Sequence, residues 1–140
     1  MRVSHPNDAY ESVHGQFAWQ VPHQFNIAEA CCGRWARSTS HQKQTAIVTH
    51  LSAHVPDQSR SFLDLQQAAD ILSLQLQKKG VKVGDRVAIV MPQRFETAVA
   101  YMAVLQMGAV AMPLSMLFGP EALAFRVQDS EASVALCDEV

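Results

Sequence analysis

The residues of this chain whose types could carry out hydrolysis are a serine, an aspartate and several histidines. Ser61, Asp64 and one of the six histidines would supply the hydroxyl, carboxylate and imidazole of a hydrolytic triad. Ser61 lacks the flanking glycines of a G-x-S-x-G turn, which would present its hydroxyl above a sheet. Its spacing from Asp64 is instead typical of a capping box at the start of a helix. We therefore predict a structural role for Ser61 and assign no catalytic residue.

Metal binding is not supported by the histidines and cysteines. None of the histidines belongs to an H-E-x-x-H pattern or has a cysteine partner at zinc spacing, so we expect no metal site. The three cysteines are Cys31, Cys32 and Cys137. Their number is odd, and adjacent cysteines rarely form a disulfide. Reduced thiols are typical of the cytoplasm, where we expect this protein to be located.

Phosphate binding is the third chemistry that the side chains could support. Arg86, Arg94 and Arg126 could grip phosphates, but solvated surface arginines are the more common case. The two glycines at 80 and 84 are too few and wrongly spaced for a phosphate loop, so we interpret them as turn residues. A formal net charge of −2 and the absence of a basic cluster argue against a nucleic-acid partner.

The second half of the chain alternates between apolar strands and helices. Residues 87–90 form a continuous apolar run, which is typical of a strand buried on both faces. A helix over 94–107, a buried strand at 109–112, a helix from Gly119-Pro120 to 130 and a strand at 134–137 are expected to follow. Helical crossovers between buried strands indicate parallel pairing. This predicts an α/β fold whose ligands would bind beyond the carboxyl ends of the strands, near 91–93 and 113–119.

The uncharged stretch 97–120 is long enough to cross a bilayer. Gln106, Gly108, Pro113 and Ser115 interrupt it, and its pattern changes from helical to extended at Gly108. We therefore predict a buried helix followed by a buried strand, and no membrane span.

The first half of the chain divides into an arm and the start of the folded part. We expect residues 1–24 to form an irregular arm that packs its aromatic rings on a domain surface, and 25–140 to form the folded part. Helices are expected from Asn26 and from Ser61, the second ending at Gly80, with a strand at 45–50 and a polar turn at 54–60 between them. The predicted inner faces are Ile27, Ala30, Cys31 and Trp35 in the first helix, Leu65, Ala69, Leu72 and Leu76 in the second, and Phe95, Val99, Met102 and Gln106 in the helix over 94–107.

Taken in order, several stretches resemble the N-terminal portion of AMP-forming acyl-coenzyme A synthetases, in the acetyl- to medium-chain branch of the adenylate-forming superfamily. These stretches are 17–22, 25–28, 34–36, 61–65, 84–89, 91–93, 105–114, 117–123 and 126–130. The resemblance implies that 25–140 is an incomplete parallel-sheet portion of the large N-terminal domain of an adenylate-forming enzyme. It also implies that the Phe118-Gly119 pair lies near the nucleotide of coenzyme A, although a turn with a helix cap explains the pair equally well.

The complete family enzyme is a ligase of fatty acid metabolism that requires ATP, Mg²⁺ and coenzyme A. It converts a carboxylic acid into an acyl-adenylate and then into a thioester. The family's phosphate loop, rich in Ser, Thr and Gly and ending in lysine, has no counterpart in these residues. We therefore expect no cofactor and no activity for this chain alone.

The third strand lies close to the last residue, Val140, although a parallel sheet needs neighbours and helices on both faces. We therefore expect a truncated piece of the synthetase. Two alternatives stay open. The chain could be a non-catalytic module that complements a separately encoded remainder, or a small membrane-attached protein that uses 97–120.

Overall fold

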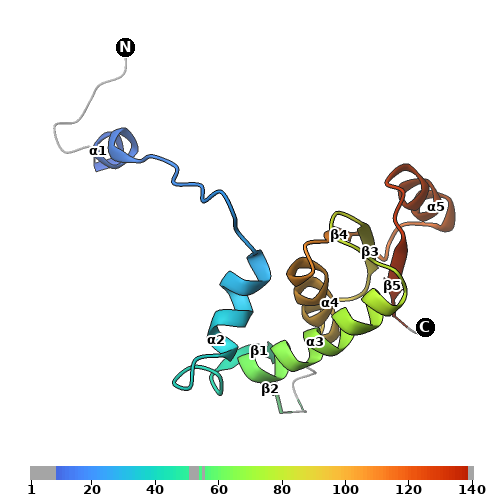
Figure 1. Cartoon of the computed structure of the whole chain (residues 1–140), viewed down its shortest axis with the longest axis horizontal. Helices are drawn as coiled ribbons and strands as arrows, with labels where there is room; N and C mark the ends of the chain where they lie inside the picture. Colours follow the sequence, from blue (N-terminus) through green and yellow to red (C-terminus); the bar gives the residue numbers. More distant parts are fainter. Residues whose placement is uncertain (1–8, 51–53, 55, 139–140) are drawn as a thin grey trace.

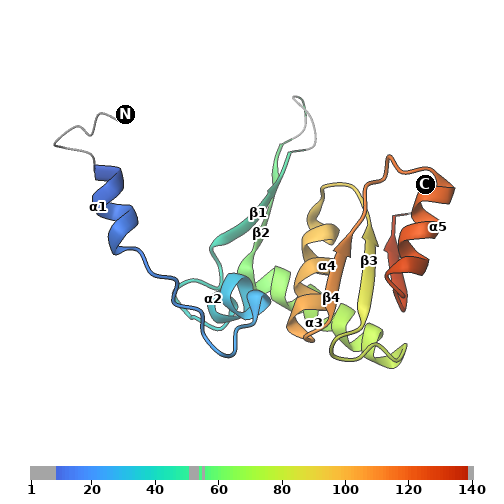
Figure 2. The ribbon, with the colours of Figure 1, turned by 90° about the horizontal axis from the view of Figure 1, so that it is seen from above.

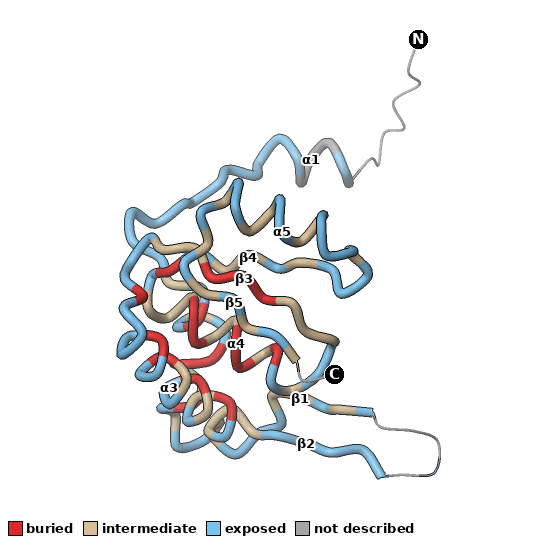
Figure 3. The backbone as a smooth tube through the Cα atoms, turned by 90° about the vertical axis from the view of Figure 1, so that its right-hand side faces the viewer, coloured by how far each residue is buried: buried red, intermediate tan, exposed pale blue. Residues whose placement is uncertain are grey.

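The computed structural model describes residues 9–50, 54 and 56–138, which form a parallel sheet with helices on both sides and a separate hairpin (Figures 1 and 2). The elements are α1 (Ala9–Gln16), η1 (Glu29–Gly33), α2 (Arg34–Ala36), β1 (Thr45–Thr49), β2 (Gln58–Ser61), α3 (Phe62–Lys78), β3 (Arg86–Val90), α4 (Phe95–Gln106), β4 (Val110–Pro113), α5 (Pro120–Asp129) and β5 (Val134–Cys137). Helices α3 and α4 lie on one side of the sheet, and α5 lies on the other (Figure 3). The predicted α/β fold with a parallel sheet is confirmed.

The three-stranded sheet has the order β4-β3-β5, so β3 is its central strand. Both neighbours run parallel to β3, with Val87 opposite Ala111 on one side and opposite Val134 on the other. Val87, Ala88 and Ile89 are almost completely buried, as predicted for this strand. The expectation that β4 is also buried is wrong. Strands β4 and β5 consist of half-buried and exposed residues because each has a neighbour on one side only within the described residues.

The core lies where α3 and α4 pack on each other and on the sheet (Figure 3). Leu76 from α3, Val104 from α4 and Val87 from β3 are its largest buried aliphatic side chains. A second cluster joins Cys32 to Leu65 and Val99, and attaches the η1 segment to the same two helices. Buried apolar side chains that interlock in this way supply the main stabilising free energy of the fold.

Two predicted inner faces differ from the observed ones. In the first helical segment the buried residues are Ala28, Cys32, Gly33 and Ala36, because a π-helical turn shifts the face that meets α3. Helix α4 lies between α3 and the sheet, so it buries a broader surface than one stripe. Its buried residues are Thr97, Val99, Ala100, Ala103 and Val104. Only Val99 belongs to the predicted stripe of this helix.

Helix α3 follows the prediction more closely. Leu65, Ala69 and Leu76 are buried, and Gly80 adopts the positive φ of +92° expected of a C-cap glycine. Ser61 accepts a hydrogen bond from the Asp64 N–H, and the Asp64 carboxylate accepts one from the Ser61 N–H. This reciprocal capping box confirms the structural role of Ser61.

Strand β1 was expected, but its partner β2 was not. The two form an antiparallel hairpin, and the expected polar turn at 54–60 therefore overlaps a strand. Part of that turn, at 55, lies outside the described residues. Strand β2 has the sequence Gln-Ser-Arg-Ser, which lacks the apolar alternation of a half-buried strand, so pairing with β1 decides its conformation.

The N-terminal arm is not irregular throughout, because α1 occupies its middle. Residues 9–24 of the arm run away from the rest of the molecule (Figures 1 and 2). The rings of Phe17 and Trp19 do not pack on a domain surface, contrary to the expectation. Phe17 and Trp19 are largely exposed and contact each other edge to face, with ring centroids 5.0 Å apart.

Residues 97–120 form a helix and then a strand, as predicted, but only the helix α4 is buried and the strand β4 is not. Among the described residues, no helix combines the length and the apolar character that crossing a bilayer requires.

Candidate functional site

The carboxyl end of the sheet is where an open parallel sheet normally binds its ligand. The loop after β3, residues 91–93, and the loop after β4 both lie there, as predicted. The Leu114 N–H donates to the Ile89 carbonyl at 2.9 Å, so the second loop leaves the sheet beside the first. The first crossover places α4 on one side of the sheet, and the second places α5 on the other (Figure 3).

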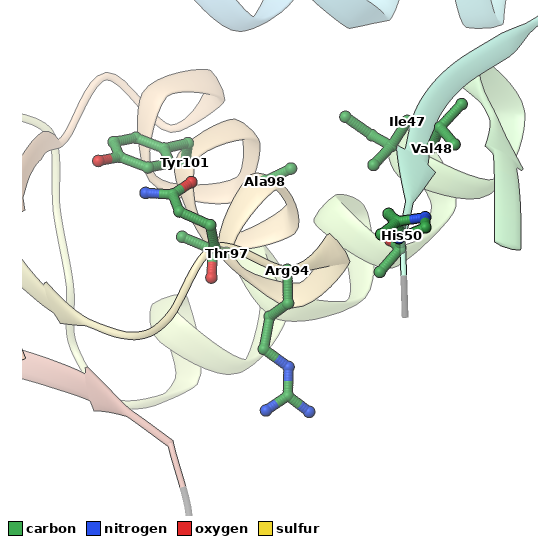
Figure 4. Close-up of a pocket in the computed structure, with 9 residues that line it drawn as sticks. Ile47, Val48, His50, Arg94, Thr97, Ala98 and Tyr101 are labelled. Carbon is green, nitrogen blue, oxygen red and sulfur yellow. The ribbon is translucent and has the colours of Figure 1, made fainter. Parts of the chain in front are cut away.

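A groove of about 320 Å³ lies next to this edge, between the hairpin and the start of α4. Figure 4 shows Ile47, Val48 and His50 on one side and Thr97, Ala98 and Tyr101 on the other. The remaining lining residues are Thr49, Gln93 and Arg94. The groove therefore has apolar walls with a polar end, and its volume is suitable for a small organic molecule.

Arg94 is the main cation at the polar end of the groove, and its guanidinium donates hydrogen bonds to two carboxylates. Its Nε donates to Glu96 at 2.9 Å, and its Nη1 donates to Asp138 at 2.6 Å. The hydrogen bond to Glu96 and the charge of Asp138 raise the pKa of the Arg94 guanidinium. The pKa of Glu96 is lowered, first by a hydrogen bond from its own backbone N–H and then by Arg94. Figure 4 shows the Arg94 side chain pointing away from Ile47 and Val48.

The other two candidate arginines also have partners within the molecule. Arg86 donates to the Ser130 carbonyl at 2.7 Å and to Glu131 at 2.8 Å. The Arg126 guanidinium lies 4.1 Å from the centre of the Phe118 ring. All three arginines hold elements of the fold together, so their expected role as simply solvated surface groups needs correction.

No catalytic constellation is assembled at the groove. His50 Nδ1 lies 2.7 Å from Asp57 Oδ1, but Ser61 is committed to its helix cap. Within the described ranges, no three His, Cys, Asp or Glu side chains come together in a way that could hold a metal ion. The described groups can orient or enclose a ligand, and Ser61 is not available as a nucleophile for His50.

Phe118 and Gly119 lie apart from the groove, at the start of α5. Gly119 precedes the first residue of that helix, and its carbonyl accepts from the Leu123 N–H at 3.0 Å. The Phe118 ring is half-buried and stacks against Arg126, while Gly119 is exposed. The geometry accounts for the pair as a helix start with a packed ring.

Sequence reasoning missed the hairpin side of the groove. Ile47 to His50 carry no motif, and they reach α4 only because β1 pairs with the unexpected strand β2. Gln93, by contrast, belongs to a loop that the sheet topology had already singled out.

Comparison with known proteins matches residues 34–140 to the family described as AMP-binding enzyme. The acetyl-coenzyme A synthetase of Halorhodospira halophila is 35% identical over 114 residues, which cover 81% of this chain and 17% of that protein. The acetyl-coenzyme A synthetase of Sinorhizobium medicae is 36% identical over 115 residues, with the same coverage. This chain thus spans about a sixth of the length of these relatives.

The fold is also found in a crystal structure of Brucella canis acyl-CoA synthetase. The two superpose with a TM-score of 0.77 at 24% identity, over 90% of this chain and 24% of that one. The family match over residues 34–140, which is most of its length, shows that the chain belongs to the AMP-binding enzyme family.

Proposed function

We propose that these residues form the N-terminal part of the large domain of an AMP-forming acyl-coenzyme A synthetase. The observation that carries this proposal is the family match over 34–140, supported by relatives that are acetyl-coenzyme A synthetases. In the proposed reaction, a carboxylate oxygen attacks the α-phosphorus of ATP, and pyrophosphate leaves as the acyl-adenylate forms. The thiol of coenzyme A then attacks the acyl carbon, its proton is lost, and AMP leaves.

The contribution of this portion to that reaction is architectural. Arg94 is neutralised by Glu96 and Asp138, and the described residues contain no metal cluster. Contacts to ATP, Mg²⁺ and the carboxylic acid are therefore assigned to parts of the enzyme beyond these 140 residues. We place the enzyme in the cytoplasm, in keeping with its free cysteines, and its reaction in the metabolism of short to medium fatty acids.

The coenzyme A contact of Phe118 and Gly119 is also part of the proposal. The exposed Gly119 backbone and the neighbouring Arg126 guanidinium would suit an anionic, planar nucleotide. In the complete enzyme, Phe118→Ala should raise KM for coenzyme A and leave KM for ATP unchanged. An equal rise in both would count against a specific contact.

Two assays test the proposed function. The purified 140-residue chain should release no pyrophosphate from ATP in the presence of coenzyme A and acetate, butyrate or octanoate. The same chain, replacing the matched segment of the Halorhodospira halophila synthetase, should give a hybrid enzyme with acid-dependent pyrophosphate release. Turnover by the chain alone would contradict its architectural role. A folded hybrid without turnover would contradict the proposed function.

A non-catalytic module that complements a separate polypeptide is the second candidate. It is favoured by the half-exposed edge strand β5, which could accept a further strand. If this is so, co-expression with the product of the neighbouring reading frame should yield a complex. Failure to form a complex would contradict this second candidate function.

A further inference from the structure

We draw no further inference here: the strongest candidate, the groove between the β1–β2 hairpin and the start of α4, carries none because its main cation, Arg94, is already paired with Glu96 and Asp138 and nothing in the structure shows what covers its apolar walls.

Discussion

Arg94 donates a hydrogen bond through Nη1 to Asp138 Oδ2 at 2.6 Å and so joins the start of α4 to the residue after β5, 44 positions later. Both residues lie at the carboxyl end of the sheet. The central strand β3 reaches the same end, so this contact ties an edge strand to the helix that follows the central one. It thereby restrains the end of the edge strand β5.

Removing this ion pair should loosen β5 without unfolding the protein. We expect Asp138→Ala to raise amide exchange in β5 about two- to fivefold, the range typical of a partly exposed ion pair. Glu96→Ala is the control, since it leaves the Arg94–Asp138 contact in place and should not affect β5. The difference in β5 amide exchange between Asp138→Ala and the unmodified protein should decrease at high salt, because salt screens the ion pair. Equal exchange in both variants would show that the pair does not restrain the strand.

Leu76 should be among the residues most important for stability. It is 2% exposed and packs with Val87 and Val104, so Leu76→Ala should lower the free energy of unfolding by about 2–5 kcal/mol. Leu74 lies on the same helix and is 56% exposed, so Leu74→Ala should change the free energy of unfolding by less than about 0.5 kcal/mol. Urea denaturation measures both. Similar losses in the two variants would mean that α3 does not pack as described.

Alanine substitutions at two glycines should have opposite effects. Gly33 is helical, and an added Cβ would meet only the ends of the flexible Glu29 and Arg37 side chains. Gly33→Ala should therefore stabilise the protein by up to about 1 kcal/mol through helix propensity. Gly80 has φ +92°, so Gly80→Ala should destabilise it by about 1–2 kcal/mol. Thermal melting distinguishes the two signs, and a destabilised Gly33→Ala would show that Glu29 and Arg37 cannot move aside.

The capping box predicts part of the loss of the protein's stability at acid pH. Hydrogen bonds from the Ser61 backbone N–H and hydroxyl lower the pKa of Asp64 below its usual value of 3.8. A lowered folded-state pKa means that the contribution of Asp64 is present above about pH 4 and is lost as the pH falls through the folded value. Asp64→Asn should flatten the loss of stability between about pH 4 and pH 2, measured by urea denaturation. Asp129→Asn, at the exposed end of α5, should follow the unmodified protein.

The three cysteines should react differently with thiol reagents. Cys31 and Cys137 are exposed, whereas Cys32 is fully buried, and its burial raises its pKa to about 11. At neutral pH, two thiols of the native protein should therefore be modified, and the third should react only after denaturation. Rapid labelling of Cys32 in the native state, mapped by mass spectrometry, would contradict its position in the core.

Local signals in the sequence account for the elements that were predicted correctly. The apolar run at 87–90, the Ser61–Asp64 spacing and Gly80 each express a short-range requirement: burial on both faces, a cap for free N–H groups, and a positive φ. The resemblance to AMP-forming synthetases depended on the same kind of ordered local stretches, and the family match bears it out.

What the sequence by itself determined was therefore the order and type of most elements, the parallel sheet and the family. The tertiary structure decided which faces are buried, that Gln58–Ser61 pairs as a strand, and that Arg94 is held by Asp138. It also decided that Val110 and Leu114 donate to β3, so that Pro113 comes to point outward. Such features depend on contacts between residues that lie far apart in the chain. The free energy of these contacts exceeds local conformational preference, and it cannot be predicted from any short stretch of sequence.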